Sequence, residues 1–161
     1  MNVNVSMKVY QISKHLVWNA YLQIKANGGS AGIDNICLKD YESNLKSNLY
    51  KLWNRMSSGS YMPKPVKLVE IPKQDGGKRP LGIPTIEDRI AQMTAVKMIE
   101  DRFERIFHTD SYGYRHGKSA HNAVEMAKRR CWQYDWVLDM DISKFFDTID
   151  HDLLLSAVKG T

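Results

Sequence analysis

The sequence predicts an α+β fold, in which helices pack on a small antiparallel sheet. Two observations lead to this prediction. Apolar residues recur at helical spacing over several long segments, whereas residues 65–84 alternate with the period of a strand on both sides of the turn signal Asp75-Gly76-Gly77. The 161 residues are 43% apolar and 25% charged, which is typical of a globular chain and excludes one that is wholly disordered.

Each expected element has its own signals. Residues 9–26 and 39–57 carry apolar stripes near the helical period, and the turn-rich run 27–32 separates them. Thr85 predicts the start of the longest helix, over 85–107, because its hydroxyl can accept a hydrogen bond from the first turn. The other expected elements are a helix over 120–131, a short buried strand over 136–142, and a helix over 151–159 capped by Asp150.

Several classes of protein are excluded by simple features. No run reaches the roughly 18 consecutive apolar residues of a membrane span, and the N-terminus lacks the pattern of a secretory signal. Cys37 and Cys131 lie far apart and match neither a disulfide framework nor a zinc spacing. We therefore expect a reduced, cytoplasmic protein that has no membrane partner.

Charge is distributed unevenly along the chain. The net charge is +5, with +4 in residues 1–60, +5 in residues 61–130 and −4 in residues 131–161. All six acids of the last segment are aspartates. A basic body beside an Asp-rich end is typical of a polyanion-binding surface next to a cation site, although charges that merely solvate exposed faces give the same totals.

Two aspartates share one face of the expected strand over 136–142. Asp139 and Asp141 alternate along it, and alternate residues of a strand point the same way. Carboxylates at a strand end suit Mg²⁺, and two such ions clamp the attacking and leaving oxygens in phosphoryl transfer. The alternative is an exposed strand end with solvated acids.

Cations gather on the expected hairpin. Lys73, Lys78 and Arg79 flank its Gly-Gly tip, and Lys67 lies on the first strand. Such a hairpin can hold a triphosphate, because arginine makes bidentate contacts to phosphate and lysine supplies a point charge. A basic, soluble sheet edge explains the same residues.

Aromatic and cationic residues occur together in the expected loop before residue 120. Tyr112, Tyr114, Arg115, His116 and Lys118 form a composition that suits stacking on bases and pairing with phosphates. A well-packed loop with ordinary tyrosine contacts is the alternative.

These segments, in this order, resemble group II intron-encoded reverse transcriptases, which are also maturases. Residues 71–85 with Asp88-Arg89 resemble the first fingers motif of that family, and residues 111–121 resemble the second. Residues 139–151 resemble the palm motif that bears the first catalytic aspartate. Upstream, residues 27–34 and Tyr61-Met62-Pro63 match the N-terminal extension, so the resemblance covers nearly the whole chain from about residue 18.

The resemblance implies a right-hand polymerase, of which this chain holds the fingers and the beginning of the palm. The implied domains are a helical N-terminal extension over 1–60, fingers over 61–134, and the start of the palm over 135–161. The implied activity is RNA-directed DNA synthesis, with a role in intron splicing and mobility. The implied partners are an RNA template (the intron RNA), a DNA primer and deoxynucleoside triphosphates, in a bacterial or organellar setting.

Roles for individual residues follow from the same resemblance. Asp141 would bind both magnesium ions, with the backbone carbonyl of Ile142 helping to hold one, and Phe146 would lie under the sugar of the incoming nucleotide. The implied triphosphate ligands are Lys73 and Arg79, with Lys67 as a third, and the residues implied to lie near the template are Tyr114, Arg115 and Lys118.

The sequence also departs from the family pattern. The second motif often reads Phe-Arg-Pro-Gly-Arg, where this chain has residues 114–118 as Tyr-Arg-His-Gly-Lys, and the Tyr-x-Asp-Asp hairpin is absent. We therefore expect part of a longer polymerase that is inactive alone. Two alternatives remain: a non-catalytic RNA-binding module, and a related bacterial reverse transcriptase that serves defence or diversity generation.

Overall fold

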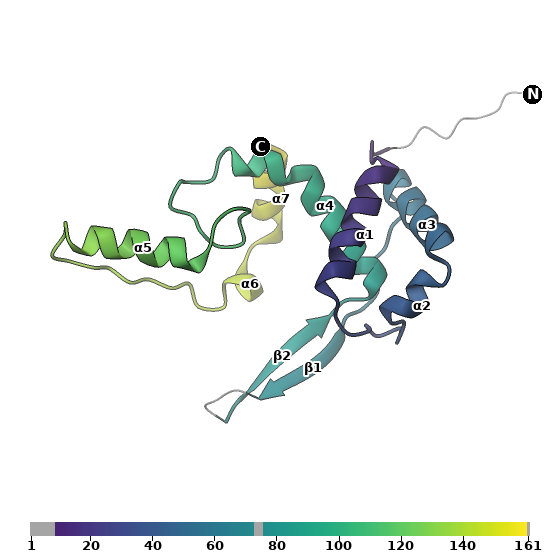
Figure 1. Ribbon diagram of the computed structural model, residues 1–161, viewed down its shortest axis with the longest axis horizontal. Coiled ribbons are helices and arrows are strands. Elements are labelled where there is room, and N and C mark those ends of the chain that lie inside the picture. The colour runs from purple at the N-terminus through teal and green to yellow at the C-terminus, as the bar shows by residue number, and fades with distance from the viewer. Residues whose placement is uncertain (1–8, 73–75, 161) are drawn as a thin grey trace, which may run out of the picture. The chain divides into compact units, whose positions relative to one another are not determined.

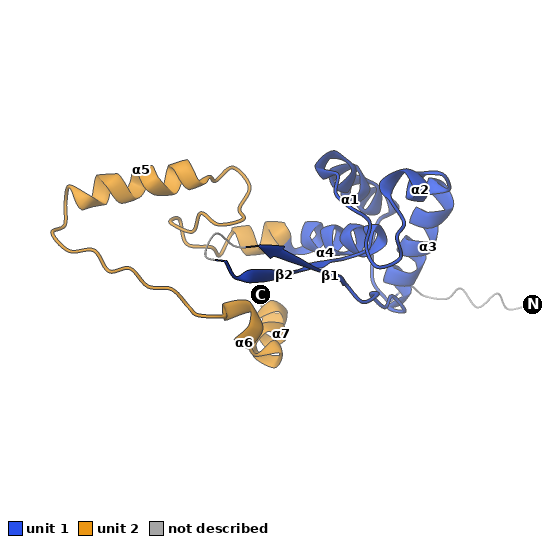
Figure 2. Ribbon diagram, turned by 90° about the horizontal axis from the view of Figure 1, so that it is seen from below, with its two compact units in different colours: residues 1–99 blue, residues 100–161 orange. Residues whose placement is uncertain are grey.

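The computed structural model describes residues 9–72 and 76–160 of the chain (Figure 1). Two units divide it, over residues 1–99 and 100–161 (Figure 2). The elements in chain order are α1 (Lys14–Asn27), α2 (Leu38–Glu42), α3 (Leu45–Ser58), β1 (Lys67–Pro72), β2 (Lys78–Ile83), α4 (Ile86–Glu104), α5 (Ala120–Cys131), α6 (Phe145–Thr148) and α7 (His151–Gly160).

The core of the first unit is built from helices. Ser13 begins α1 as an N-cap, since its hydroxyl accepts from the Leu16 backbone N–H at 3.1 Å. The helix α1 packs on α3, which also contacts α2. The buried apolar residues are Ile12, Val17, Ala20, Tyr21 and Ile24 around α1, Tyr41, Leu49 and Leu52 of α2 and α3, and Ile86, Ile90 and Ala91 of α4.

The single helix expected over 39–57 is two helices. Asn44 leaves the helical conformation, with φ −132° and ψ 41°. Local side chains take up the backbone groups that this break frees: the Ser43 hydroxyl donates to the Asp40 carbonyl at 2.7 Å, and the Asn48 amide donates to the Tyr41 carbonyl at 2.9 Å. Serine and asparagine compete with the helix for backbone hydrogen bonds, and here they interrupt it.

The hairpin forms as expected, but the helices do not pack on it. Strands β1 and β2 pair antiparallel, with Lys67 opposite Ile83 and Ile71 opposite Arg79. Apart from the partly buried Val69 and Ile83, the strand residues are exposed. Figure 1 shows the hairpin projecting away from the helices of its unit. The expected combination of helices with a small antiparallel sheet is confirmed, but among the described residues the buried core comes from the helices and the segment before α1, and no strand residue is part of it.

The second unit lacks a core of its own. It contains the end of α4, then α5, α6 and α7, and none of its described residues is buried. The apolar stripe predicted along the long helix is buried at its start, where Ile86 and Ile90 lie in the core. Further along the helix, Val96 and Ile99 of α4 are exposed. Asp150 caps α7 as predicted, accepting from the backbone N–H groups of residues 152 and 153 at 2.9 and 3.0 Å.

The buried strand predicted over 136–142 does not form. This segment has no regular secondary structure, and its apolar side chains, from Trp136 to Ile142, are exposed. A strand needs a neighbouring strand to take its backbone hydrogen bonds, and among the described residues only β1 and β2 pair. The pattern of the segment is that of a strand, but the partner is missing.

Among the described helices, none has both the length and the apolar composition needed to cross a membrane.

Candidate nucleotide and nucleic-acid interface

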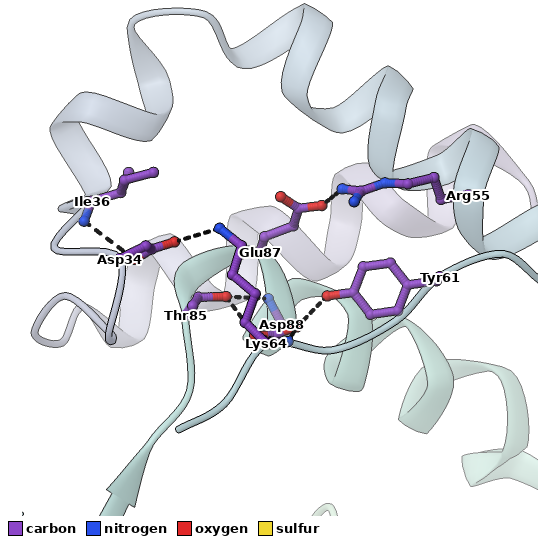
Figure 3. A network of polar contacts seen from close by, with 8 residues as sticks. All are labelled: Asp34, Ile36, Arg55, Tyr61, Lys64, Thr85, Glu87 and Asp88. Carbon is purple, nitrogen blue, oxygen red and sulfur yellow. Dashed lines mark hydrogen bonds and ion pairs between the residues drawn. The ribbon is translucent and has the colours of Figure 1, made fainter. Parts of the chain in front are cut away.

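A buried polar network begins helix α4 (Figure 3). Thr85 caps the helix as predicted, and its hydroxyl accepts from the Asp88 backbone N–H at 3.1 Å and donates to the Asp88 carboxylate at 2.6 Å. The Tyr61 hydroxyl donates to the other oxygen of that carboxylate. Burial, followed by this hydrogen bond, raises the pKa of Tyr61, so the phenol stays protonated at any physiological pH. Tyr61 is thus joined to the start of α4, 27 positions further along the chain.

The same network ties the loop after α1 to the base of the hairpin. The Lys64 ammonium lies 3.1 Å from the Asp34 carboxylate, and the Arg89 guanidinium donates to the Ser30 carbonyl and, at 3.2 Å, to the Pro84 carbonyl (Figure 3 shows the first of these contacts). Lys64 precedes β1 and Pro84 follows β2. Both ends of the hairpin are therefore anchored by residues of the motifs 27–34, 61–63 and 71–89.

Gly32 lies against this anchor so closely that only glycine fits. A Cβ at residue 32 would meet the backbone of Thr85 at 2.7 and 2.8 Å from its Cα and N atoms. We expect Gly32→Ala to lower the free energy of unfolding by about 1–3 kcal/mol, because the loop must move away from the cap of α4. Urea denaturation followed by circular dichroism measures it. Gly113→Ala is the control, since nothing lies within 4 Å of its Cβ position; equal losses for the two would contradict the close packing.

The hairpin register separates its cations onto two faces. Because residues directly opposite each other share a face, Lys67 and Arg79 lie on the same side as Val69 and Ile71. Four strand positions separate them, which corresponds to about 13 Å. Lys78 lies on the other face, where it pairs with Glu70 at 2.6 Å. Lys73, the remaining predicted triphosphate ligand, lies outside the described residues.

Arg115 is held inside its loop. Its Nε and Nη2 donate to the Glu104 carboxylate, and its Nη1 donates to the backbone carbonyls of His108 and Ser111 at 2.7 and 2.9 Å. Its side chain is only 7% exposed and lies over the Phe107 ring. The Arg115 guanidinium lowers the pKa of Glu104, so this pair is intact at neutral pH and is lost only as the pH falls through that lowered value.

The neighbours of Arg115 differ in how far their side chains are exposed to solvent and held by contacts within the protein. Tyr114 is wholly exposed, and its φ of 55° lies in the left-handed region, which a bulky residue rarely adopts. Lys118 donates from Nζ to the Thr109 carbonyl at 3.0 Å and lies over the Tyr112 ring. Of the three predicted nucleic-acid contacts, Tyr114 alone presents its whole side chain to solvent.

The predicted catalytic residues lie on an exposed stretch of the second unit. Asp139, Asp141 and Ile142 are exposed and lie in the irregular segment before α6. Lys144 then turns the chain with φ 52°. A carboxylate and a backbone carbonyl are hard oxygen donors of the kind that Mg²⁺ prefers, so the donor chemistry fits that ion. In the part of the chain that the structure describes, no group of three or more acidic, histidine or cysteine side chains could hold a metal.

Two phenylalanines follow at the start of α6. Their rings meet edge to face, with centroids 5.3 Å apart. Phe146 is 81% exposed and Phe145 is 43% exposed. The outward residue of the pair is therefore Phe146, the one predicted to face the nucleotide.

A groove between α1 and α3 was not predicted from the sequence. It has a volume of about 1000 Å³, and the rings of Trp18, Tyr50 and Trp53 line it. Lys14 lies at its rim, with its ammonium 4.5 Å from the Trp53 ring centroid, and His15 and Lys46 also line the groove. None of the described lining residues is acidic. No role was assigned to these aromatic residues from the sequence, because spacing within two separate segments does not show that their faces meet in the fold.

A family model described as reverse transcriptase (RNA-dependent DNA polymerase) matches residues 71–160, which is more than half of the chain. The chain belongs to the reverse transcriptase family. The match includes the end of β1, all of β2, the loop around Arg115 and the segment of Asp141, so the resemblance stated from the sequence is confirmed.

Individual relatives extend the similarity upstream of residue 71. Protein YkfC of Escherichia coli strain K12 is 38% identical over 133 residues, 80% of this chain and 35% of that protein. The group II intron-encoded protein LtrA of Lactococcus lactis subsp. cremoris is 30% identical over 150 residues, 92% of this chain and 25% of that protein. Nuclear intron maturase 1, mitochondrial, of Arabidopsis thaliana is 25% identical over 76 residues, 47% of this chain and 11% of that protein.

This reverse transcriptase chain spans only about a third, or less, of the length of these curated relatives. Alignments that cover 80% and 92% of the chain are longer than the 90 residues of the family match, so they take in part of the helical N-terminal region.

Proposed function

We propose that this chain supplies the fingers and the beginning of the palm of an RNA-directed DNA polymerase of the group II intron type. A longer polypeptide that contains this chain and a Tyr-x-Asp-Asp hairpin, which we call the intact enzyme, copies RNA into DNA. The observation that supports this most is the hairpin register, which puts Lys67 and Arg79 on one face of a projecting, firmly anchored hairpin. That face is the one that holds the triphosphate.

The proposed domains are the N-terminal extension over 1–60, the fingers over 61–134 and the start of the palm over 135–161. The break between the two units, after residue 99, falls inside the proposed fingers. The helix α4 crosses that break, so the two parts of the fingers are joined by one continuous helix.

Residues of the second unit have the following proposed roles. Asp141 holds both magnesium ions and the Ile142 carbonyl helps to hold one; the ions, when bound, stabilise the charge that develops on the attacking and leaving oxygens. Further carboxylates from the intact enzyme complete this shell. The Phe146 ring lies beneath the sugar of the incoming nucleotide, and Tyr114 stacks on a base of the template strand.

Neutralising the hairpin cations tests this proposal. In the intact enzyme we expect Arg79→Ala to raise the KM for deoxynucleoside triphosphates about tenfold or more, because a charge-assisted contact to phosphate is lost. Lys67→Ala should act in the same direction. Steady-state primer extension on an RNA template, at varied nucleotide concentration, measures the change.

Lys78→Ala is the matched control for this experiment. It removes the same charge from the neighbouring position on the same strand, but from the opposite face, where Lys78 pairs with Glu70. We expect its KM to stay within about twofold of the wild-type value. A rise equal to that of Arg79→Ala would contradict the proposed triphosphate-binding face.

A second candidate function is a non-catalytic RNA-binding module that helps intron RNA to fold. The groove between α1 and α3 favours it, because three aromatic rings and a cationic rim without acids are the features that bind single-stranded nucleic acid. The two candidates are compatible, since the groove lies in the first unit and Asp141 lies in the second.

A further inference from the structure

Most hydrogen-bond donors of the Arg115 guanidinium are already used within the protein. Its Nε and Nη2 donate to the Glu104 carboxylate and its Nη1 donates to two backbone carbonyls, so all five of its hydrogen bonds end within the chain segment 104–115. The carboxylate neutralises its charge, and its side chain is 7% exposed. A phosphate could reach this group only by displacing Glu104. Arg115 is therefore placed to organise the loop rather than to contact nucleic acid.

A second ion pair closes the same loop from its other side. The Arg130 guanidinium, at the end of α5, lies 2.6 Å from the Asp110 carboxylate and lowers its pKa. The Lys118 ammonium is tied to the Thr109 carbonyl. Tyr114 lies between residues 110 and 118, which these two contacts hold. It adopts the left-handed conformation, and its ring is wholly exposed to solvent.

A left-handed conformation at a bulky residue costs free energy, so surrounding contacts must impose it. The two carbonyls that Arg115 contacts, of His108 and Ser111, precede Tyr114, and residue 115 follows it directly, so these hydrogen bonds tie together the chain before and after Tyr114. These contacts explain why the Tyr114 ring is exposed to solvent, although an aromatic ring is usually buried by packing.

We propose that Glu104, acting through Arg115, is a positioning residue that holds Tyr114 out as the stacking platform for a nucleic-acid base. This inference rests on the proposed function, because it assumes that the loop binds a nucleic-acid strand. It reverses the role that sequence resemblance implies for Arg115, and it gives a role to an acid within a basic region.

Affinity for a fluorescein-labelled single-stranded oligoadenylate, measured by anisotropy on the full chain, tests this inference. We expect Tyr114→Ala to weaken binding about tenfold, the effect of losing one base–aromatic contact. Glu104→Gln should weaken it to a similar extent, although it removes a negative charge. If the surface acted through charge alone, Glu104→Gln would tighten binding.

Matched variants separate positioning from charge. Asp101→Asn removes an exposed carboxylate one turn earlier on the same helix and should leave affinity unchanged or slightly higher. Arg115→Lys keeps the charge but loses the planar fork that spans Glu104 and two carbonyls, so it should weaken binding as Glu104→Gln does. A lysine that contacted phosphate directly would preserve affinity. In the double variant Tyr114→Ala/Glu104→Gln the two losses should not add, because both remove the same contact.

The outcomes distinguish an error in the proposed function from an error in the positioning role of Glu104. If the wild-type chain fails to bind the oligonucleotide, the proposed function is wrong. If the wild-type chain binds while Glu104→Gln and Arg115→Lys match it, the positioning role alone is wrong. Circular dichroism of each variant shows whether it folds, and Arg115→Lys decides the question if Glu104→Gln does not.

Discussion

Asp141→Ala abolishes DNA synthesis by the intact enzyme and leaves its affinity for RNA nearly unchanged. This is the largest effect that we expect, because in the proposed function the carboxylate holds metal ions that stabilise the transition state and has no part in docking the template. Loss of such a ligand lowers kcat by roughly a thousandfold or more. Primer extension on an RNA template measures kcat, and anisotropy with the same RNA measures affinity.

Asp139→Ala is the control for Asp141→Ala. Asp139 is exposed in the same irregular segment and carries the same charge, but the family motif does not demand an acid at its position. We expect its effect on kcat to be much milder. Equal and total loss in both variants would show that the two aspartates have been assigned wrongly, and a loss of RNA affinity in Asp141→Ala would show a docking role.

Phe146→Ala relaxes the choice between deoxyribonucleotides and ribonucleotides. A ring beneath the sugar leaves no room for a 2′-hydroxyl, so discrimination rests on a steric clash with the wrong substrate. Removing the ring should lower the preference for deoxyribonucleotides by roughly tens-fold, a few kcal/mol in relative transition-state binding. The ratio of kcat/KM for the two substrates, measured with the intact enzyme, gives the change.

Phe145→Ala tests the register of this assignment. Phe145 is about half as exposed as Phe146, which fits a packing role for its ring. We expect Phe145→Ala to lower the melting temperature and to leave sugar choice intact. If Phe145→Ala relaxes sugar choice while Phe146→Ala only unfolds the protein, the register across this turn is wrong by one residue.

Elements with signals inside their own segment were predicted well from the sequence. Thr85 and Asp150 begin helices because their side chains accept from the first turn, and the hairpin forms around its glycine turn. The prediction of a strand over 136–142 is wrong, although the pattern of this segment is that of a strand. A strand depends on a partner elsewhere, and no local pattern supplies that partner.

The candidate site shows the same division. Residue types and order identified the family from the sequence, whereas the roles of the hairpin cations and of Phe146 stay predictions. The face on which each cation lies follows only from the register, which separates Arg79 from Lys78. The pairing of Arg115 with Glu104 joins a helix end to a loop, and the α1–α3 groove joins residues about 30 positions apart. Such contacts depend on tertiary packing, which spacing does not encode.

We propose that this chain binds nucleic acid, whereas the complete set of catalytic residues lies in the intact enzyme. The most direct test incubates the purified chain of 161 residues with a labelled DNA primer on an RNA template, Mg²⁺ and deoxynucleoside triphosphates, and follows binding and extension together over a range of salt. We expect binding that weakens steeply with salt, by about 0.7 in the log–log slope for each single-strand phosphate contacted, without extension of the primer. Absent or salt-independent binding, or template-dependent extension above a protein-free control, would contradict it.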